Sequence, residues 1–249
     1  MSQLEGRNPI LECLKRSRRR VFRIWLDQGA KPDVRIRELL ELAQTGGIKV
    51  ERVPRTELDR RSSGRVHNGV IAEVEPVTSW SMHGLLEAPR VHHPPLFVLA
   101  DGLSYEHNLG AVLRSCLGFG AEGLVVPTRR GAGLSPVVER VSMGAIEEVP
   151  LVREGLYGAI KNLKREGYRV VGADMKGEDA SALDLSGPVA LVLGGEGSGL
   201  SSKLKERCDA LVSIPLHGAL ESLNVSVAAG ILMYEKRRQD GWYEASSGP

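Results

Sequence analysis

Two loops of small and polar residues, each placed directly after an apolar run, are the part of this sequence best suited to chemistry. Residues 189–193 are all apolar and lead into the glycine-rich stretch 194–199. Residues 210–214 form a second, mostly apolar run, followed by a glycine-containing loop and by residues 222–228. Glycine lets a backbone approach a ligand closely, and the start of a helix offers unpaired N–H groups. Side by side, the two loops would form a small-molecule site built largely of main chain.

Five polar side chains could take part in such a site, or could be ordinary helix caps, a surface arginine and part of a flexible turn. Asn108 precedes a helical pattern and has the character of an N-cap, and Arg114 follows less than two turns later. Because helical side chains lean toward the N-terminus, the Arg114 guanidinium is expected near the loop end of the sheet, where open α/β folds bind ligands. Glu196 is a carboxylate among glycines, which suggests that it is held in place for a specific role. The alternative is that residues 194–199 form only a flexible turn. Ser222 and Asn224 begin an apolar helical pattern and could both be capping residues.

Several familiar sites are absent from the sequence. The stretch 194–199 is not followed by the Gly-Lys-Ser/Thr of a Walker loop, and its glycine spacing differs from the dinucleotide fingerprint. No Gly-x-Ser-x-Gly elbow surrounds Ser222, which argues against a hydrolase nucleophile. His92 and His93 have no third ligand nearby, so exposed linker residues are favoured over a metal site.

The composition is typical of a globular protein with one large or two small domains. The chain has 249 residues, of which 42% are hydrophobic and 26% charged. No apolar run approaches the roughly eighteen residues of a membrane span, and the start of the sequence lacks the pattern of a signal peptide. Cys13, Cys116 and Cys208 are far apart, which argues against a disulfide framework or a zinc site and favours the reducing cytoplasm.

The net charge of +2 conceals a difference between the two ends of the chain. Residues 1–75 hold 16 Lys and Arg against 11 Asp and Glu, a balance of +5. The remaining residues hold 17 against 20, a balance of −3. A basic N-terminal module on a mildly acidic body suggests a polyanionic partner, most simply nucleic acid. A solvated basic surface without a partner is the alternative.

Alternating strand and helix patterns predict an α/β protein with two domains. In residues 1–75, Asn8 and Pro9 form a good helix opening, and strands and helices alternate after it. Residues 76–95 are interrupted by proline, serine and glycine and are predicted to be an interdomain linker. Residues 96–249 begin with a continuous apolar run, which is typical of a parallel strand covered on both faces. This second domain is predicted to contain a doubly wound parallel sheet.

Three segments resemble, in order, the motifs of the SpoU (TrmH-like) RNA 2′-O-methyltransferases, a family of the SPOUT superfamily. They are Asn108-Leu109-Gly110 with Arg114, then residues 193–200, then residues 214–216 with 222–228. Residues 6–9, Gly-Arg-Asn-Pro, resemble the start of the family's substrate-binding domain, and residues 144–150 resemble a segment between the first two motifs. Tyr105-Glu106 departs from the Asp-Pro that family members often carry at this point.

The resemblance implies a C-terminal methyltransferase domain with a parallel sheet and a deep trefoil knot, preceded by a small N-terminal α/β domain of the L30e-like type. It also implies S-adenosyl-L-methionine as the cofactor, and homodimers whose active site is completed across the interface. Arg114 matches the family's catalytic arginine, and the further catalytic residues implied are Asn108, Glu196, Ser222 and Asn224. The cofactor-binding residues implied are Leu193, Gly194, Gly195, Ile214, Leu216, Ser222 and Leu223.

The function expected from this resemblance is methylation of a ribose 2′-hydroxyl in structured RNA. A guanosine of 23S rRNA is favoured because the two-domain layout resembles the rRNA branch of the family, and tRNA is the first alternative. A non-catalytic RNA-binding or assembly factor is a second alternative, against which the retained Asn108, Arg114, Glu196 and Asn224 argue. A small-molecule nucleotide-binding enzyme would leave the basic N-terminal module unexplained. Neither a metal nor a membrane is expected as a partner.

Overall fold

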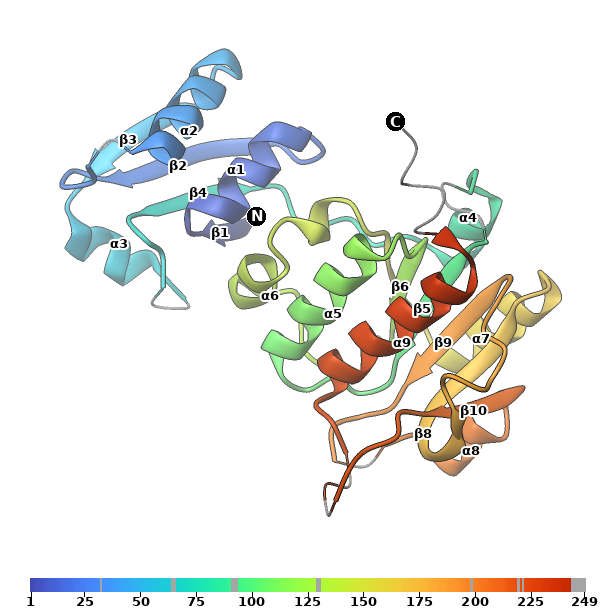
Figure 1. Cartoon of the computed structure of the whole chain (residues 1–249). Coiled ribbons are helices and arrows are strands. Elements are labelled where there is room, and N and C mark those ends of the chain that lie inside the picture. Colours follow the sequence, from blue (N-terminus) through green and yellow to red (C-terminus); the bar gives the residue numbers. More distant parts are fainter. Residues whose placement is uncertain are drawn as a thin grey trace. The chain divides into compact units, whose positions relative to one another are not determined.

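The chain forms two compact units in a computed structural model (Figure 1). The structure describes residues 1–31, 33–63, 66–90, 94–128, 131–197, 199–218, 220 and 222–242. The first unit contains Met1–Thr78 together with Gly133–Glu148, and the second contains Ser79–Ala132 together with Val149–Pro249. No helix within the described ranges is long and apolar enough to cross a membrane.

The first unit is built on a four-stranded mixed sheet with the order β1-β4-β2-β3. β1 and β2 are both antiparallel to β4, whereas β2 and β3 are parallel. Its strands and helices are β1 (Ser2–Glu5), α1 (Arg7–Arg16), β2 (Val21–Asp27), α2 (Val34–Thr45), β3 (Lys49–Val53), α3 (Arg55–Arg61) and β4 (Val70–Val74). The apolar sides of α1 and α2 share one core cluster with the sheet, and α3 contributes Leu58 to a second cluster with Trp25 and Ile71.

Helix α1 begins two residues earlier than the sequence pattern predicts. The pattern made Asn8 the N-cap, but Gly6 occupies that position with φ of 100°, a conformation that suits glycine. The reason is that Ser2–Glu5 pairs as a strand with β4, so the chain must turn sharply at Gly6 before the helix starts. Asn8 therefore lies inside the first turn, where its side chain is free for other contacts.

The segment 133–148 packs within the first unit through a buried group of charges. It contains α6 (Pro136–Val141) and a 3₁₀ turn at Ala145–Glu147. The Arg19 guanidinium donates to Glu139 Oε2 at 2.8 Å and to Glu147 Oε2 at 3.0 Å, and all three side chains are almost fully buried. Gly144 has φ of 88°, and a Cβ there would lie 2.6 Å from Glu12 Cβ, so glycine is needed for this close approach.

The second unit contains a six-stranded sheet in which every neighbouring pair is parallel, with the order β10-β8-β9-β5-β6-β7. The strands are β5 (Leu96–Ala100), β6 (Gly123–Val126), β7 (Leu151–Arg153), β8 (Arg169–Asp179), β9 (Val189–Leu193) and β10 (Ala210–Ser213). The helices are α4 (Met82–Glu87), α5 (Glu106–Gly118), α7 (Leu156–Arg165), α8 (Ser202–Lys205) and α9 (Val225–Gln239). The predicted parallel α/β sheet is confirmed.

Helices cover both faces of this sheet, which explains the unbroken apolar runs of β5 and β9. Phe97 and Leu99 of β5 pack in a core cluster with side chains of α4, α7 and α8. Helices α5 and α9 pack against each other and lie over the opposite face, as Figure 1 shows. Every residue of β5 and β9 is therefore buried, as expected for central strands of a parallel sheet.

Part of the stretch 76–95, expected from its composition to be a linker, is folded into the second unit. Helix α4 begins after Ser81, whose Oγ accepts a hydrogen bond from Gly84 N at 3.1 Å. Met82 and Leu85 are buried in the core cluster of the sheet. The paired residues His92 and His93 lie outside the described residues.

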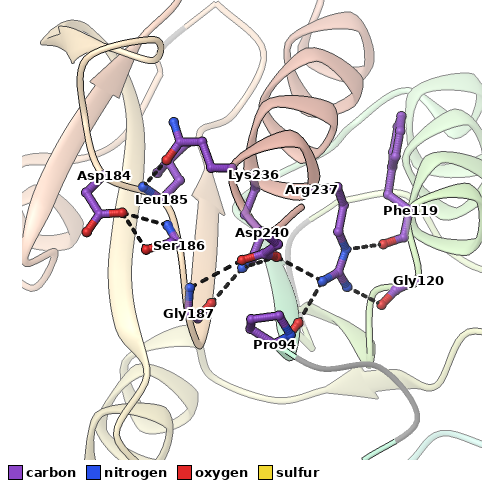
Figure 2. Close-up of polar contacts among 11 residues, drawn as sticks. Pro94, Phe119, Gly120, Asp184, Leu185, Ser186, Gly187, Lys236, Arg237 and Asp240 are labelled. Carbon is purple, nitrogen blue, oxygen red and sulfur yellow. Dashed lines mark hydrogen bonds and ion pairs between the residues drawn. The ribbon is translucent and has the colours of Figure 1, made fainter. Parts of the chain in front are cut away.

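The C-terminal end of α9 is anchored at the edge of the sheet where the strands begin (Figure 2). The buried Arg237 guanidinium donates to the carbonyl oxygens of Phe119, Gly120 and Pro94 at 2.6–2.7 Å. Lys236 Nζ donates to Gly187 O at 2.6 Å and to Asp240, and burial lowers the pKa of this lysine. Because Pro94, Gly120 and Gly187 each precede a strand, this anchor directs the start of α9 toward the opposite edge, where the strands end.

Candidate active site

The loops after β5, β9 and β10 meet because parallel strands end at the same edge of a sheet. Ala100 of β5 pairs directly with Leu193 of β9, and Asp101 N donates to Leu193 O at 2.9 Å just beyond the paired segment. The loop after β5 leads into α5, the loop after β9 is glycine-rich, and the loop after β10 leads into α9. This edge is where ligands bind in open parallel α/β sheets.

Three of the predicted catalytic side chains form one hydrogen-bonded chain across these loops. Asn108 Nδ2 donates to Glu196 Oε1, and Asn224 Nδ2 donates to Asn108 Oδ1 at 3.0 Å. Asn224 Oδ1 in turn accepts from Ser226 N at 2.9 Å and from Ser226 Oγ at 2.6 Å. The structure thus brings together residues from three separate sequence segments.

Asn108 does not cap α5, contrary to the sequence pattern. The helix begins at Glu106 with Tyr105 at the N-cap position, so Asn108 lies in the first turn. Its carboxamide instead bridges Glu196 and Asn224, because the folded chain places both partners beside it. Asn224 does cap α9 through its bond with Ser226 N, as one of the two interpretations of this residue predicted.

One carboxylate oxygen of Glu196 has no partner among the residues that the structure describes. Its Oε1 accepts from Asn108 and, at 3.4 Å, from Tyr105 N, whereas Oε2 is buried and has no hydrogen bond to any described residue. Leaving a buried carboxylate oxygen unpaired costs free energy, which a bound donor would recover. Tyr105 was not identified from the sequence, because a contact made by its main-chain N–H leaves no signal in residue type.

The glycine-rich loop closes on itself immediately after β9. Gly195 N donates to Gly199 O at 3.2 Å, and Gly199 N donates to Gly195 O at 3.0 Å. A Cβ on Gly194 would lie 2.3 Å from Gly199 C and 2.5 Å from Leu200 N, so the two arms of the loop touch through main chain alone. Ser198 lies outside the described residues.

Arg114 stands apart from this hydrogen-bonded chain. Its side chain is exposed on α5, six residues after Asn108, and forms no hydrogen bond or ion pair with any described residue. Six helical residues correspond to about 9 Å along the helix axis. The guanidinium is therefore available to bind an external group rather than occupied in a structural contact.

The residues implied for the cofactor differ in exposure. Leu193 is buried at the end of β9, whereas Ile214, Leu216 and Leu223 are half-buried in the segment between β10 and α9. Ser222 is exposed in the same segment. Among the described residues, no three His, Cys, Asp or Glu side chains are grouped as metal ligands would be, and all three cysteine thiols are free.

Comparison with known protein families accounts for both units. Residues 95–234 match the model of the SpoU rRNA methylase family, and residues 3–80 match the RNA 2′-O ribose methyltransferase substrate-binding model. The chain belongs to the SpoU rRNA methylase family. The predicted family, its α/β fold and its classification as an RNA methyltransferase are thereby confirmed.

Individual relatives agree with this assignment. The putative TrmH family tRNA/rRNA methyltransferase YacO of Bacillus subtilis is 38% identical over 237 residues, which is 94% of this chain and 94% of that protein. An uncharacterized tRNA/rRNA methyltransferase of Mycolicibacterium smegmatis is 40% identical over 237 residues, 94% of this chain and 75% of that protein.

Solved structures of SpoU proteins share the fold. The SpoU methyltransferase AviRb from Streptomyces viridochromogenes, in complex with the cofactor AdoMet, has a TM-score of 0.79 and 25% identity and covers 99% of this chain and 91% of its own. An RNA 2′-O ribose methyltransferase has a TM-score of 0.80 and 28% identity, covering 95% and 88% respectively.

Proposed function

We propose that this chain uses S-adenosyl-L-methionine to methylate the ribose 2′-hydroxyl of a guanosine in 23S rRNA. The observation that carries this proposal is the hydrogen-bonded chain of Glu196, Asn108 and Asn224, which joins the three family motifs at one edge of the sheet. The substrate-binding match over residues 3–80 supports an RNA substrate. The AdoMet complex of AviRb supports the choice of cofactor.

The residues present fit this cofactor. Its adenosine and methionine parts need main-chain donors and acceptors beside an apolar surface, and the loop after β9 begins with the half-buried Gly194 and Gly195, which have no side chain to keep a ligand away from the backbone. Leu193, Ile214, Leu216 and Leu223 supply apolar surface, and Ser222 a hydroxyl. When bound, the cofactor supplies a methyl group on a positively charged sulfur. The trefoil knot that the resemblance implies in this region stays a prediction.

Arg114 is the residue assigned to the 2′-hydroxyl. A guanidinium scarcely gives up its proton in a protein, so Arg114 acts as a cation rather than as a base. Its unpaired fork binds the phosphate of the target nucleotide and stabilises the negative charge that develops on the 2′-oxygen. The proton of the hydroxyl passes to solvent or to a phosphate. Asn108, Glu196 and Asn224 hold the loops in place, and Glu196 Oε2, which has no partner among the described residues, accepts a hydrogen bond from the ribose or from Arg114.

A homodimer is the assembly that we propose for this enzyme. Val227, Ile231 and Tyr234 recur at helical spacing along one face of α9 and are 49%, 39% and 48% exposed. A second copy of the chain that covers this face would remove the apolar surface from water. The same helix is capped at its start by Asn224, so such a dimer would place residues of the second copy close to the site.

Arg114→Ala tests this mechanism in a single-turnover assay with radiolabelled cofactor and rRNA. The methyl-transfer rate should fall about 100- to 1000-fold, as when one oxyanion-stabilising group is removed. Cofactor affinity, measured by calorimetry, should stay near the native value. Arg114→Lys keeps the charge but loses the two-pronged geometry, and Arg165→Ala at the end of α7 is the control. An unchanged rate in Arg114→Ala would remove this residue from the mechanism.

The choice between rRNA and tRNA is tested by mapping ribose methylations in total RNA from cells with and without the gene. Loss of one methylated guanosine in 23S rRNA would support the proposal. Loss of a methyl group in tRNA would favour the alternative, which is consistent with relatives named as tRNA/rRNA methyltransferases. No change in either RNA, together with no affinity for the cofactor, would favour a non-catalytic RNA-binding factor.

A further inference from the structure

The first unit contains a cavity of about 690 Å³ with an excess of positive charge. The cavity lies where α1 begins, beside the loop between β2 and α2 and the start of α3. Its cationic lining consists of Arg7, Lys31, Arg35, Arg55 and Arg140. Cavities of about 300–1,000 Å³ hold small-molecule ligands, so one nucleotide fits this volume.

Only part of this positive charge is paired with acidic side chains in the part of the chain that the structure describes. The two acidic residues of the lining are both paired, Asp27 with Arg55 at 3.5 Å and Asp33 with Arg7. Lys31, Arg35 and Arg140 form no ion pair with any described residue, which leaves three cations for a ligand. Lys31 and Arg35 are also exposed, so a ligand can reach them from solvent.

Arg140 indicates the kind of ligand. Its Nη1 is buried and has no hydrogen-bond partner among the described residues. A buried guanidinium N–H without an acceptor costs free energy, and a phosphate oxygen is an acceptor that the planar guanidinium fork matches. An anion bound here would therefore satisfy a group that the described residues leave without an acceptor.

Two carboxamides in the same lining add the ability to contact a base. Asn8 Nδ2 points to Met143 Sδ at 3.8 Å, a weak acceptor that a base could readily replace. Asn68 is exposed and has φ of 47°, a left-handed conformation that asparagine tolerates. Carboxamides pair with the edges of bases, and such edges are accessible in unpaired RNA nucleotides.

We infer that this cavity binds one unpaired nucleotide of the RNA substrate, with Arg140, Arg35 and Lys31 on its phosphate and Asn8 on its base. This inference rests on the proposed function for the choice of RNA. We assign the cavity a nucleotide other than the methylated one: its described lining residues all belong to the first unit, whereas Asn108, Glu196 and Asn224, which we assign to methyl transfer, belong to the second. The cavity thus contributes to the choice of substrate rather than to methyl transfer.

The test compares two arginines on one helix in the full-length protein. Arg35 lines the cavity, whereas Arg37, two residues further along α2 and also exposed, does not. Affinity for a fluorescein-labelled single-stranded oligouridylate and for an RNA duplex of equal length is measured by anisotropy at several salt concentrations. R35A should weaken single-strand binding about fivefold and lower the slope of log affinity against log salt by about one, whereas R37A should remain close to the native protein. Equal effects of R35A and R37A would overturn the inference.

A second measurement does not depend on a loss of affinity. Oligouridylate that carries 4-thiouridine is irradiated with the native protein, and crosslinked peptides are identified by mass spectrometry. Crosslinks to the peptides that contain Asn8 or Met143 support the cavity, and crosslinks confined to other peptides overturn it.

R140K retains the positive charge but loses the planar guanidinium fork. This variant should weaken RNA binding, while its melting temperature shows that the fold is intact.

Failure of this inference can be told apart from failure of the proposed function. Methyl transfer by the native protein is measured separately, with rRNA and with tRNA. If the native protein transfers methyl groups but R35A and R37A bind RNA equally well, only the cavity assignment fails. If no RNA is methylated but R35A selectively loses RNA affinity, the cavity assignment stands and the proposed reaction fails.

Discussion

Substitution of Gly194 by alanine tests whether the loop after β9 holds the cofactor. A Cβ at this position would lie 2.3 Å from Gly199 C and 2.5 Å from Leu200 N, both of them main-chain atoms. No side-chain rotation can relieve such a contact. The two arms of the loop must move apart by about 1 Å to reach ordinary van der Waals distance, against the paired hydrogen bonds between Gly195 and Gly199.

The expected magnitude follows from the cost of overpacking. Forcing extra atoms into a closely packed site costs about 1–3 kcal/mol. If this cost falls on the cofactor-bound loop, the dissociation constant for S-adenosylmethionine rises about 5- to 150-fold, since each 1.4 kcal/mol corresponds to a factor of ten. Isothermal titration calorimetry measures this constant, and thermal denaturation measures how much of the cost appears instead as lost stability of the free protein.

Gly155 provides the matched control. It precedes α7 with φ of −66°, and a Cβ there meets no atom within 4 Å, so the same substitution creates no strain. Gly155→Ala should therefore bind the cofactor as the native protein does. If Gly194→Ala is folded and also binds S-adenosylmethionine with native affinity, the loop is not the cofactor site and the assignment of Gly194 and Gly195 is wrong.

Two further predictions concern the buried charges and the assembly. Arg19→Met should lower the free energy of unfolding by about 3–5 kcal/mol in urea titrations, because it leaves the buried carboxylates of Glu139 and Glu147 without a cation. Burial raises the pKa of the Glu139 carboxyl above its ordinary value of about 4.5. The contribution of this carboxyl to the free energy of unfolding is therefore lost as pH rises above about 4.5. Over that range Glu139→Gln should gain stability relative to the native protein, and parallel curves of stability against pH would contradict this. Ile231→Glu should convert the proposed dimer into a monomer in light-scattering measurements, whereas Met175→Glu at an exposed position of β8 should not; an unchanged mass in Ile231→Glu would exclude this face.

Strand positions in the second unit could be predicted from the sequence because burial leaves a clear mark there. Residues 96–100 and 189–193 are unbroken apolar runs, and they form β5 and β9 at the centre of the sheet. The spacing of apolar residues also predicts a helix over residues 156–166, and α7 spans Leu156–Arg165 with its apolar side on the sheet. In each of these elements, local periodicity and tertiary packing favour the same structure, which is why the pattern sufficed.

The side-chain contacts of the candidate site could not be predicted from local sequence patterns. Asn108 has the residue type of a helix cap, but its partners Glu196 and Asn224 lie 88 and 116 positions away in the sequence. Propensity near the helix start carries no information about such partners. Family resemblance identified all three residues together, and only the folded chain shows that one carboxamide links the other two.

The first unit has a smaller excess of positive charge than residues 1–75 alone, and the reason bears on RNA binding. The balance of +5 for residues 1–75 includes Arg19, which is buried between Glu139 and Glu147 and cannot reach a phosphate. Residues 133–148 bring one arginine and three glutamates into the same unit, and residues 76–78 bring no charge, so its balance is +3. Attraction to RNA therefore depends less on net charge than on where unpaired cations stand. Because Lys31, Arg35 and Arg140 line one cavity and form no ion pair with a described residue, that cavity should contribute more to RNA affinity than the buried Arg19.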